Sequence, residues 1–139
     1  MADTVTGPTI LQQNDKQVVI KIVVQSDGTG STTVFGDVSA LDARNDGTAV
    51  AHLGLQRIWY SCQGGDGGDS FARLDEEDSD GDIPILALTG AAYWDFREFG
   101  GIPADQSSNS NQSDVNFVVP SAADSGNVYT VVAQFQKIY

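Results

Sequence analysis

Apolar residues recur at every second position along much of the chain, as they do in β-strands. Residues 16–26 give the clearest example, because four apolar side chains fall on one face of an extended segment, namely Val18, Ile20, Ile22 and Val24. β-Branched residues at a period of two are a strong signal for a strand. A glycine-containing turn and a second strand-like segment, residues 31–39, come next. We therefore predict that the two segments form a hairpin.

A longer run, residues 52–62, changes its pattern halfway. Its apolar residues up to Leu55 fall on one face of a strand, whereas those from Ile58 onward fall on the other. An extra residue in one strand of a pair accounts for such a change, and bulges of this kind are common where a sheet bends around a core. We expect a bulge within residues 54–57.

Strands are also predicted at residues 70–77, 83–90, 91–99, 115–119 and 126–139. Pro84 has no backbone N–H to donate. We therefore expect that its strand lies at a sheet edge or that the proline lies among the first paired residues of the strand. No segment has a helical period, and parallel sheets need helical crossovers. The sequence thus predicts an all-β fold, a single-domain antiparallel β-sandwich of about eight or nine strands, with a jelly roll as one form of it. We expect an N-terminal arm at residues 1–15 and the sandwich at residues 16–139.

The charge balance narrows the range of partners. Seven Lys and Arg residues face nineteen Asp and Glu residues in a chain of 139, so the net charge is −12. Proteins bind a phosphate backbone by releasing its counterions with cationic side chains, so we expect no nucleic-acid partner. No apolar run approaches the roughly 20 residues of a membrane-spanning helix, and the N-terminal residues lack the pattern of a signal peptide. We expect no membrane partner either.

Residues that could support catalysis are few and scattered. Cys62, the single cysteine, lies in a predicted strand, and we interpret it as a packing group. His52, the single histidine, begins a predicted strand and has no recognisable partner motif. The glycine-rich residues 63–70 lack the lysine of a phosphate-binding loop. Carboxylate pairs of the glycosidase type have no fixed sequence spacing, and nothing here singles one out. We predict a protein that is not an enzyme and has no cofactor.

An acidic turn is the best candidate for a metal site. Glu76, Asp78 and Asp80 match the start of a calcium-binding loop, in which alternate carboxylates supply oxygen ligands. The match then ends, because Ala87 stands where the bidentate glutamate should be. We favour a solvated acidic turn and keep weak calcium binding as the alternative.

Four aromatic residues crowd the segment 93-YWDFREFGG-101. In a strand, Trp94 and Phe96 share one face and Tyr93 lies on the other. We predict that Trp94 and Phe96 pack in the core and that the two glycines turn the chain at a corner. The alternative is a sugar-binding platform, since exposed rings on a β-sandwich can bind sugars. That platform would consist of Tyr93, Trp94, Trp59 and Tyr60.

Four segments carry a further pattern, namely 24-VQSDGTGSTTVFGDVSAL-41, 57-RIWYSCQGG-65, 83-IPILALTGAAYWDFREFGGIP-103 and 114-DVNFVVPSAADSGNVYTVVAQF-135. Together they resemble a family of small all-β proteins encoded among the structural genes of tailed bacteriophages. The resemblance implies a virion structural protein on the capsid exterior, assembled in the bacterial host cytoplasm. In its most concrete form it implies a capsid decoration, or cement, protein that binds the major capsid protein and stabilises the DNA-filled head. It also implies a homo-oligomer, such as a trimer.

Two regions are expected to contact these partners. The N-terminal arm carries Val5, Ile10 and Leu11, which make it apolar enough to add to a neighbouring sheet. The glycine corner carries Phe99 and Ile102. Two other functions stay open, a neck, tail or baseplate component of the virion and a carbohydrate-binding β-sandwich module.

Overall fold

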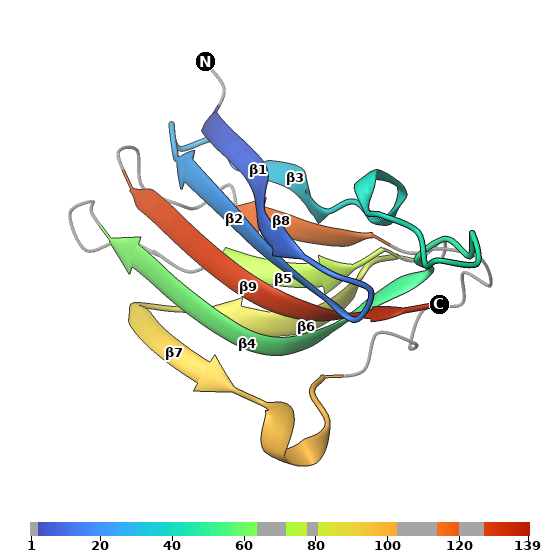
Figure 1. The fold of residues 1–139 in the computed structure, drawn as a ribbon. Helices are drawn as coiled ribbons and strands as arrows, with labels where there is room; N and C mark the ends of the chain where they lie inside the picture. Colours follow the sequence, from blue (N-terminus) through green and yellow to red (C-terminus); the bar gives the residue numbers. More distant parts are fainter. Residues whose placement is uncertain (1–2, 64–71, 78–80, 103–113, 120–126) are drawn as a thin grey trace.

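The alternating segments form strands in a computed structural model of the chain, which describes residues 3–63, 72–77, 81–102, 114–119 and 127–139. Nine strands in these residues make two antiparallel sheets (Figure 1). The five-stranded sheet contains, in spatial order, β1 (Thr4–Gln13), β2 (Gln17–Gln25), β9 (Val128–Ile138), β4 (His52–Gln63) and β7 (Ala91–Asp95). The four-stranded sheet contains β3 (Ser31–Gly36), β8 (Val115–Val119), β5 (Ala72–Glu76) and β6 (Ile83–Leu88). The predicted all-β antiparallel sandwich is confirmed.

The chain is folded like one long hairpin that wraps around the core. Its antiparallel partners are nested, since β5 pairs with β6, β4 with β7, β3 with β8, and β2 with β9. Pairing of β4 with β9 and of β5 with β8 joins these hairpin layers into the two sheets. This nesting is the jelly-roll topology, in which the two sheets are built from interlocked Greek keys.

The predicted hairpin between residues 16–26 and 31–39 is wrong. β2 and β3 lie in different sheets, and their ladder partners are β9 and β8 from the other end of the chain. The glycine turn between them does reverse the chain, but it carries the chain from one sheet to the other. Turn residues predict that the chain changes direction, but they do not predict which strand will pair with which. The pairing depends on the arrangement that buries the apolar faces of all the strands.

The inner faces of the two sheets form the core. The predicted alternation in β2 is confirmed, because Val18, Ile20, Ile22 and Val24 are all buried. Aromatic rings link the sheets, since Phe35 on β3 packs edge to face against Phe135 on β9 with ring centroids 5.8 Å apart. Edge-to-face packing of this kind suits the charge distribution of the rings and fills the space between sheets at interior density.

The predicted bulge in β4 is confirmed at Gln56. Leu55 pairs with Phe135 and Arg57 with Gln134, so Gln56 has no partner of its own on β9. The bulge reverses which side chains face inward, and both Leu55 and Ile58 are buried. As a consequence, Trp59 projects from the outer face of the five-stranded sheet. The bulge therefore decides which residues of β4 can reach a partner.

The corner predicted after the aromatic segment is also present. A short 3-10 helix, η2 (Arg97–Phe99), ends at Gly100, and the backbone φ angles of Gly100 and Gly101 are +86° and +87°. Side chains disfavour this left-handed region, which glycine enters without a steric penalty. The turn returns the chain to the β4 bulge, where Phe96 donates from its backbone to Gln56.

The edges of the sandwich are occupied by β1 and β7 in one sheet and by β3 and β6 in the other. Pro84 lies in β6, which confirms the edge position expected from its missing donor. Most of the N-terminal arm forms β1, which pairs with β2 of the same chain and ends just before the boundary expected at residue 15. Residues 4–13 are therefore part of the five-stranded sheet (Figure 1).

Candidate binding surfaces

The outer face of the five-stranded sheet carries a pair of exposed aromatic rings. Trp59 on β4 lies directly opposite Tyr93 on β7, and the two rings stack with centroids 4.9 Å apart and planes inclined by 24°. Trp59 is 38% exposed and Tyr93 is 47% exposed. Facing side chains on one side of a ladder stabilise the sheet through such contacts. Much of both rings nevertheless remains in solvent, so the pair also offers an apolar surface to a ligand.

Arg57 holds the Trp59 ring from the same strand. The guanidinium carbon of Arg57 lies 5.0 Å from the centroid of the indole ring, which is a cation–π contact. Arg57 also donates from Nε to Gln134 Oε1 at 2.9 Å. Gln134 is buried and donates from Nε2 to Gln56 Oε1 at 2.8 Å. These hydrogen bonds fix the guanidinium and so restrict the indole ring beneath it.

A shallow hollow of about 490 Å³ opens beside the Trp59 ring. The hollow is lined by Trp59, Tyr60, Ser61, Ala91, Ala92, Thr130 and Val132, none of which carries a charge. Ser61 lies opposite Ala91 on one side and Thr130 on the other, so small side chains from three adjacent strands form a row. The hollow exists because this row of small side chains is adjacent to the row that contains the bulky rings of Trp59 and Tyr93.

Trp94 and Phe96 were expected in the core, and for Trp94 this prediction is wrong. The two rings stack on each other, with centroids 6.4 Å apart, but Trp94 is 49% exposed. Phe96 is partly buried against the core, and the indole of Trp94 donates to the hydroxyl of Tyr60 at 3.2 Å. β7 is the last strand of its sheet, so the opposite sheet covers its inner face incompletely. Figure 1 shows β7 at the margin of the sandwich.

The aromatic residues named for a sugar platform therefore separate into two groups. Trp59 and Tyr93 stack on the outer face, whereas Trp94 contacts Phe96 and Tyr60 on the other side of the sheet. Sequence reasoning missed the contribution of Arg57 and the row of small residues. The parity change at the bulge was the available signal, because it places Arg57 and Trp59 on the same outer face.

Asp95 is clasped by Arg97 next to Tyr93. Arg97 donates from Nε and Nη2 to the two carboxylate oxygens at 2.9 and 2.7 Å, and its backbone N–H donates to Oδ1 at 3.0 Å. These hydrogen bonds hold the pKa of Asp95 well below its usual range. The Tyr93 hydroxyl donates to Oδ2 at 3.3 Å. The clasp thus fixes the outer end of Tyr93 as well as the start of the corner.

The β1 edge holds the apolar residues expected to contact a partner. Val5 and Ile10 lie opposite buried Val24 and Ile20 of β2, yet they are 37% and 38% exposed, and Leu11 at a register shift is 53% exposed. The four-stranded sheet covers this margin only in part. A crevice of about 80 Å³ opens there between β1 and β3, and it is lined by one acidic residue, Asp37, and by the apolar residues Pro8, Ile10, Ile20, Phe35, Ala40 and Leu41.

The glycine corner presents its two predicted contact residues differently. Ile102 exchanges backbone hydrogen bonds with Leu55 at 2.8 and 3.2 Å and is partly buried against the core. Phe99 ends the η2 helix, and its side chain lies outside the described part of the structure. Ile102 is therefore a structural contact within the chain, and the prediction that it binds a partner stays a prediction.

Of the three acidic residues predicted as calcium ligands, Glu76 lies in the described part of the structure. Glu76 lies within β5 and is buried, and its Oε1 is 3.9 Å from Nδ1 of His52, the first residue of β4. Asp78 and Asp80 lie outside the described residues. No group of three or more His, Cys, Asp or Glu side chains able to hold a metal ion occurs among the residues that the structure describes.

A second acidic group lies where η1 (Val38–Ala40) meets the start of β8. Asp114 accepts a hydrogen bond from the backbone N–H of Val38 at 3.0 Å, and Glu77 and Asp37 line the same small depression. Burial, together with the charges of its acidic neighbours, raises the pKa of Glu77. Burial and the nearby Asp37 likewise raise the pKa of Asp114. The carboxylates therefore repel one another at neutral pH.

Cys62 behaves as the packing residue that its strand position predicts. Its side chain is buried, and its Sγ lies 3.7 Å from the carbonyl oxygen of Leu88 on the opposite sheet. Burial raises the pKa of the Cys62 thiol to about 11. A thiol with so high a pKa is a poor nucleophile at neutral pH.

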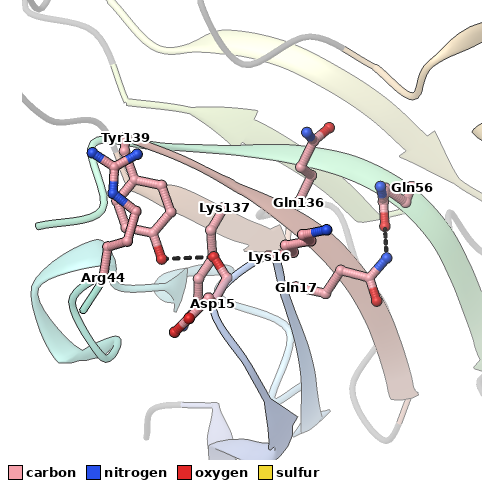
Figure 2. A pocket seen from close by; sticks show the side chains of 8 residues that line it. All are labelled: Asp15, Lys16, Gln17, Arg44, Gln56, Gln136, Lys137 and Tyr139. Atoms are coloured by element: carbon pink, nitrogen blue, oxygen red, sulfur yellow. Dashed lines mark hydrogen bonds between the residues drawn. The ribbon is translucent and has the colours of Figure 1, made fainter. Parts of the chain in front are cut away.

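A polar hollow of about 400 Å³ lies where the β1–β2 turn meets the C-terminal residues (Figure 2). Three of the seven Lys and Arg residues line it, together with one aspartate and several amide side chains. Arg44 lies over the Tyr139 ring and pairs with Asp46, and the Tyr139 hydroxyl donates to the carbonyl oxygen of Asp15 at 2.8 Å. These contacts join residue 15, residues 44–46 and residue 139 at the hollow.

Comparisons of the chain with models of protein families, with curated proteins and with solved structures found no match. No helix in the described ranges is long and apolar enough to cross a membrane.

Proposed function

We propose that this chain is a virion structural protein, and specifically a capsid decoration protein that binds the lattice of the major capsid protein and stabilises the DNA-filled head. The observation that carries the proposal is the apolar margin of the sandwich at β1. Ile10 and Leu11 remain exposed there beside a crevice that leads toward Phe35. A margin of this kind offers an apolar anchor point to a neighbouring protein.

The geometry favours insertion of side chains over continuous strand addition. Pro8 lacks a donor, and the register of β1 shifts between Thr6 and Thr9 and again between Ile10 and Gln12. Interruptions of this kind prevent a second strand from forming a long ladder along the free edge of β1. The crevice of about 80 Å³ instead has room for a small apolar side chain. We therefore place the capsid contact at the crevice and Leu11.

The fold and the net charge support this role. Jelly rolls are used in viral capsid domains. The net charge of −12 keeps copies soluble and apart until a specific contact forms. Many copies bound to one lattice, or joined in a cyclic homo-oligomer such as a trimer, raise a modest single-site affinity. Binding of many copies across the capsid surface is what stabilising the head requires.

Cryo-electron microscopy of the purified particle tests the proposal directly. Copies distributed over the capsid surface, with β1 facing the major capsid protein, are the expected result. A few copies at one vertex would instead make the chain a neck, tail or baseplate component, and absence from the particle would overturn the virion assignment.

Variants test the contact itself. Leu11→Glu places a charge on the exposed margin, and we expect it to weaken binding to heads that lack the protein by about tenfold or more, since burying an unpaired charge at an interface costs well over 1.4 kcal/mol. Val128→Glu is the control, because Val128, like Leu11, is an exposed apolar strand residue but lies on β9. Equal binding of the two variants would contradict a contact at β1.

A further inference from the structure

The Trp59–Tyr93 pair and the hollow beside it have the form of a small-ligand site on the outer face of the five-stranded sheet. The rings provide a flat apolar surface, and the row of Ser61, Ala91 and Thr130 leaves space next to it. This face lies on the opposite side of the sheet from the core. It is also separate from the β1 margin, because three strands lie between β1 and β7 in the sheet.

The chemistry of the lining restricts what the hollow can hold. All seven lining residues are uncharged in a chain whose net charge is −12. An anionic ligand, a nucleic acid included, would be repelled by the net negative charge of the protein, and the nearby Arg57 guanidinium is already bound to Gln134 and the Trp59 ring. A quaternary ammonium ligand at the aromatic pair would be repelled by the like charge of the Arg57 guanidinium, which lies 5.0 Å from the centroid of the Trp59 ring. The ligand is therefore neutral.

The lining also combines apolar and hydroxyl groups. Trp59, Ala91 and Val132 offer apolar contact, while the side chains of Ser61 and Thr130 can each donate and accept a hydrogen bond. A ligand that matches both has one apolar face and an edge of hydroxyl groups. A pyranose ring has this shape, with axial C–H groups on a face and hydroxyls around its rim. Ligand sites combine mostly apolar lining with a few polar groups in the same way.

The aromatic wall is held in place before any ligand arrives. Arg57 is fixed by Gln134, which is fixed by Gln56, and Asp95 is clasped by Arg97 and accepts from Tyr93. Rings that are already ordered lose little conformational freedom on binding, so a larger share of the contact free energy appears as affinity.

From these observations we propose that the outer face binds a neutral carbohydrate, with the exposed surface of the Trp59–Tyr93 pair against the sugar ring and with Ser61 and Thr130 contacting its hydroxyls. On a virion component, such a site would let the particle adhere to neutral glycans. The proposal does not depend on the contact at β1.

Screening on an array of neutral oligosaccharides, followed by NMR titration with the best ligand from the array, tests the proposal. We expect chemical-shift changes at the Trp59 indole N–H and at the backbone amides of Ser61, Ala91 and Thr130.

A pair of tryptophan variants tests the aromatic contact. Trp59→Ala should weaken binding about tenfold or more, as expected for loss of an aromatic contact. Trp94→Ala is the matched control, since Trp94 is the other exposed tryptophan, and it should bind within about twofold of the unaltered protein.

Ala91→Leu provides a second test that leaves both rings in place. Ala91 is exposed on an edge strand, so leucine is expected to fold there and to fill the hollow. Loss of sugar binding in this variant supports the site even if Trp59→Ala is unstable. Absence of binding to every neutral oligosaccharide on the array overturns the proposal, and so does binding that survives both changes. Shifts at the same amides with a proline-rich peptide, and none with sugars, would also overturn it. Binding to heads should be unchanged in Ala91→Leu, which separates this test from that of the capsid contact.

Discussion

Gly101 lies so close to Leu55 that a Cβ atom at position 101 would stand 2.8 Å from the Leu55 carbonyl oxygen. That oxygen accepts the backbone hydrogen bond from Ile102 at 2.8 Å, so it cannot move away without breaking the bridge between the corner and β4. The corner after β7 therefore requires a residue without a side chain at position 101, as well as a left-handed backbone conformation there.

Replacing each glycine of the corner by alanine should separate these two requirements. Both residues have positive φ, but a Cβ at Gly100 would meet no atom within 4 Å. We expect Gly100→Ala to lower the free energy of unfolding by about 1 kcal/mol, the usual penalty for a left-handed alanine. Gly101→Ala should cost about 2–4 kcal/mol because the steric clash is added. Chemical denaturation measures both, and equal losses would contradict the close approach.

Phe35 should be among the most costly core residues to truncate. Its ring packs against Phe117 in its own sheet and against Phe135 in the opposite sheet. Phe35→Ala removes both contacts and leaves a cavity, so we expect a loss of about 3–5 kcal/mol in the free energy of unfolding. The neighbouring Val34 is 39% exposed, and Val34→Ala should cost less than about 1 kcal/mol. Thermal unfolding followed by circular dichroism compares the two.

The buried thiol of Cys62 should make stability depend on alkaline pH. Its pKa is raised from 9.0 to about 11 by burial, so the folded state keeps a proton that the unfolded state has lost. The stabilisation is complete below pH 9 and is lost as the pH rises through 11, up to a total of about 2–3 kcal/mol. Cys62→Ala should be less stable at neutral pH but should lack this part of the pH dependence. Urea denaturation at several pH values measures the difference in slope, and parallel curves would rule the effect out.

Asp114→Asn should stabilise the protein at neutral pH. Burial and the Asp37 charge raise the pKa of Asp114, so its neutral form is favoured in the folded state, and stability falls as the pH rises through that pKa. Asparagine removes the charge and keeps an oxygen that can accept from the Val38 N–H. We expect a gain of up to about 1 kcal/mol at pH 7 that disappears below pH 4.

Asp114→Ala is the control for the hydrogen bond. It removes the charge and the acceptor together, so the melting temperature should show no gain at pH 7. A gain equal to that of Asp114→Asn would mean that the bond to Val38 contributes nothing.

The pattern of side chains along each strand was sufficient to predict which face turns inward. The alternation in β2, the bulge at Gln56, the edge position of Pro84 and the glycine corner all follow from local rules, because side chains alternate across a strand and because proline and glycine have fixed backbone requirements. The chain therefore determined by itself that it would form a sandwich with a single apolar core.

Pairing between strands was decided only by the tertiary structure. β2 pairs with β9 rather than with β3. Closing the short loop of a local hairpin would cost less chain entropy, but burying the apolar faces of both sheets in one core contributes more to stability. Pairing of β4 with β7 likewise brings Trp59 against Tyr93 and leaves Trp94 at an uncovered margin. Which aromatic residues face solvent together depends on neighbours that lie far away in the sequence, and no pattern within one strand contains that information.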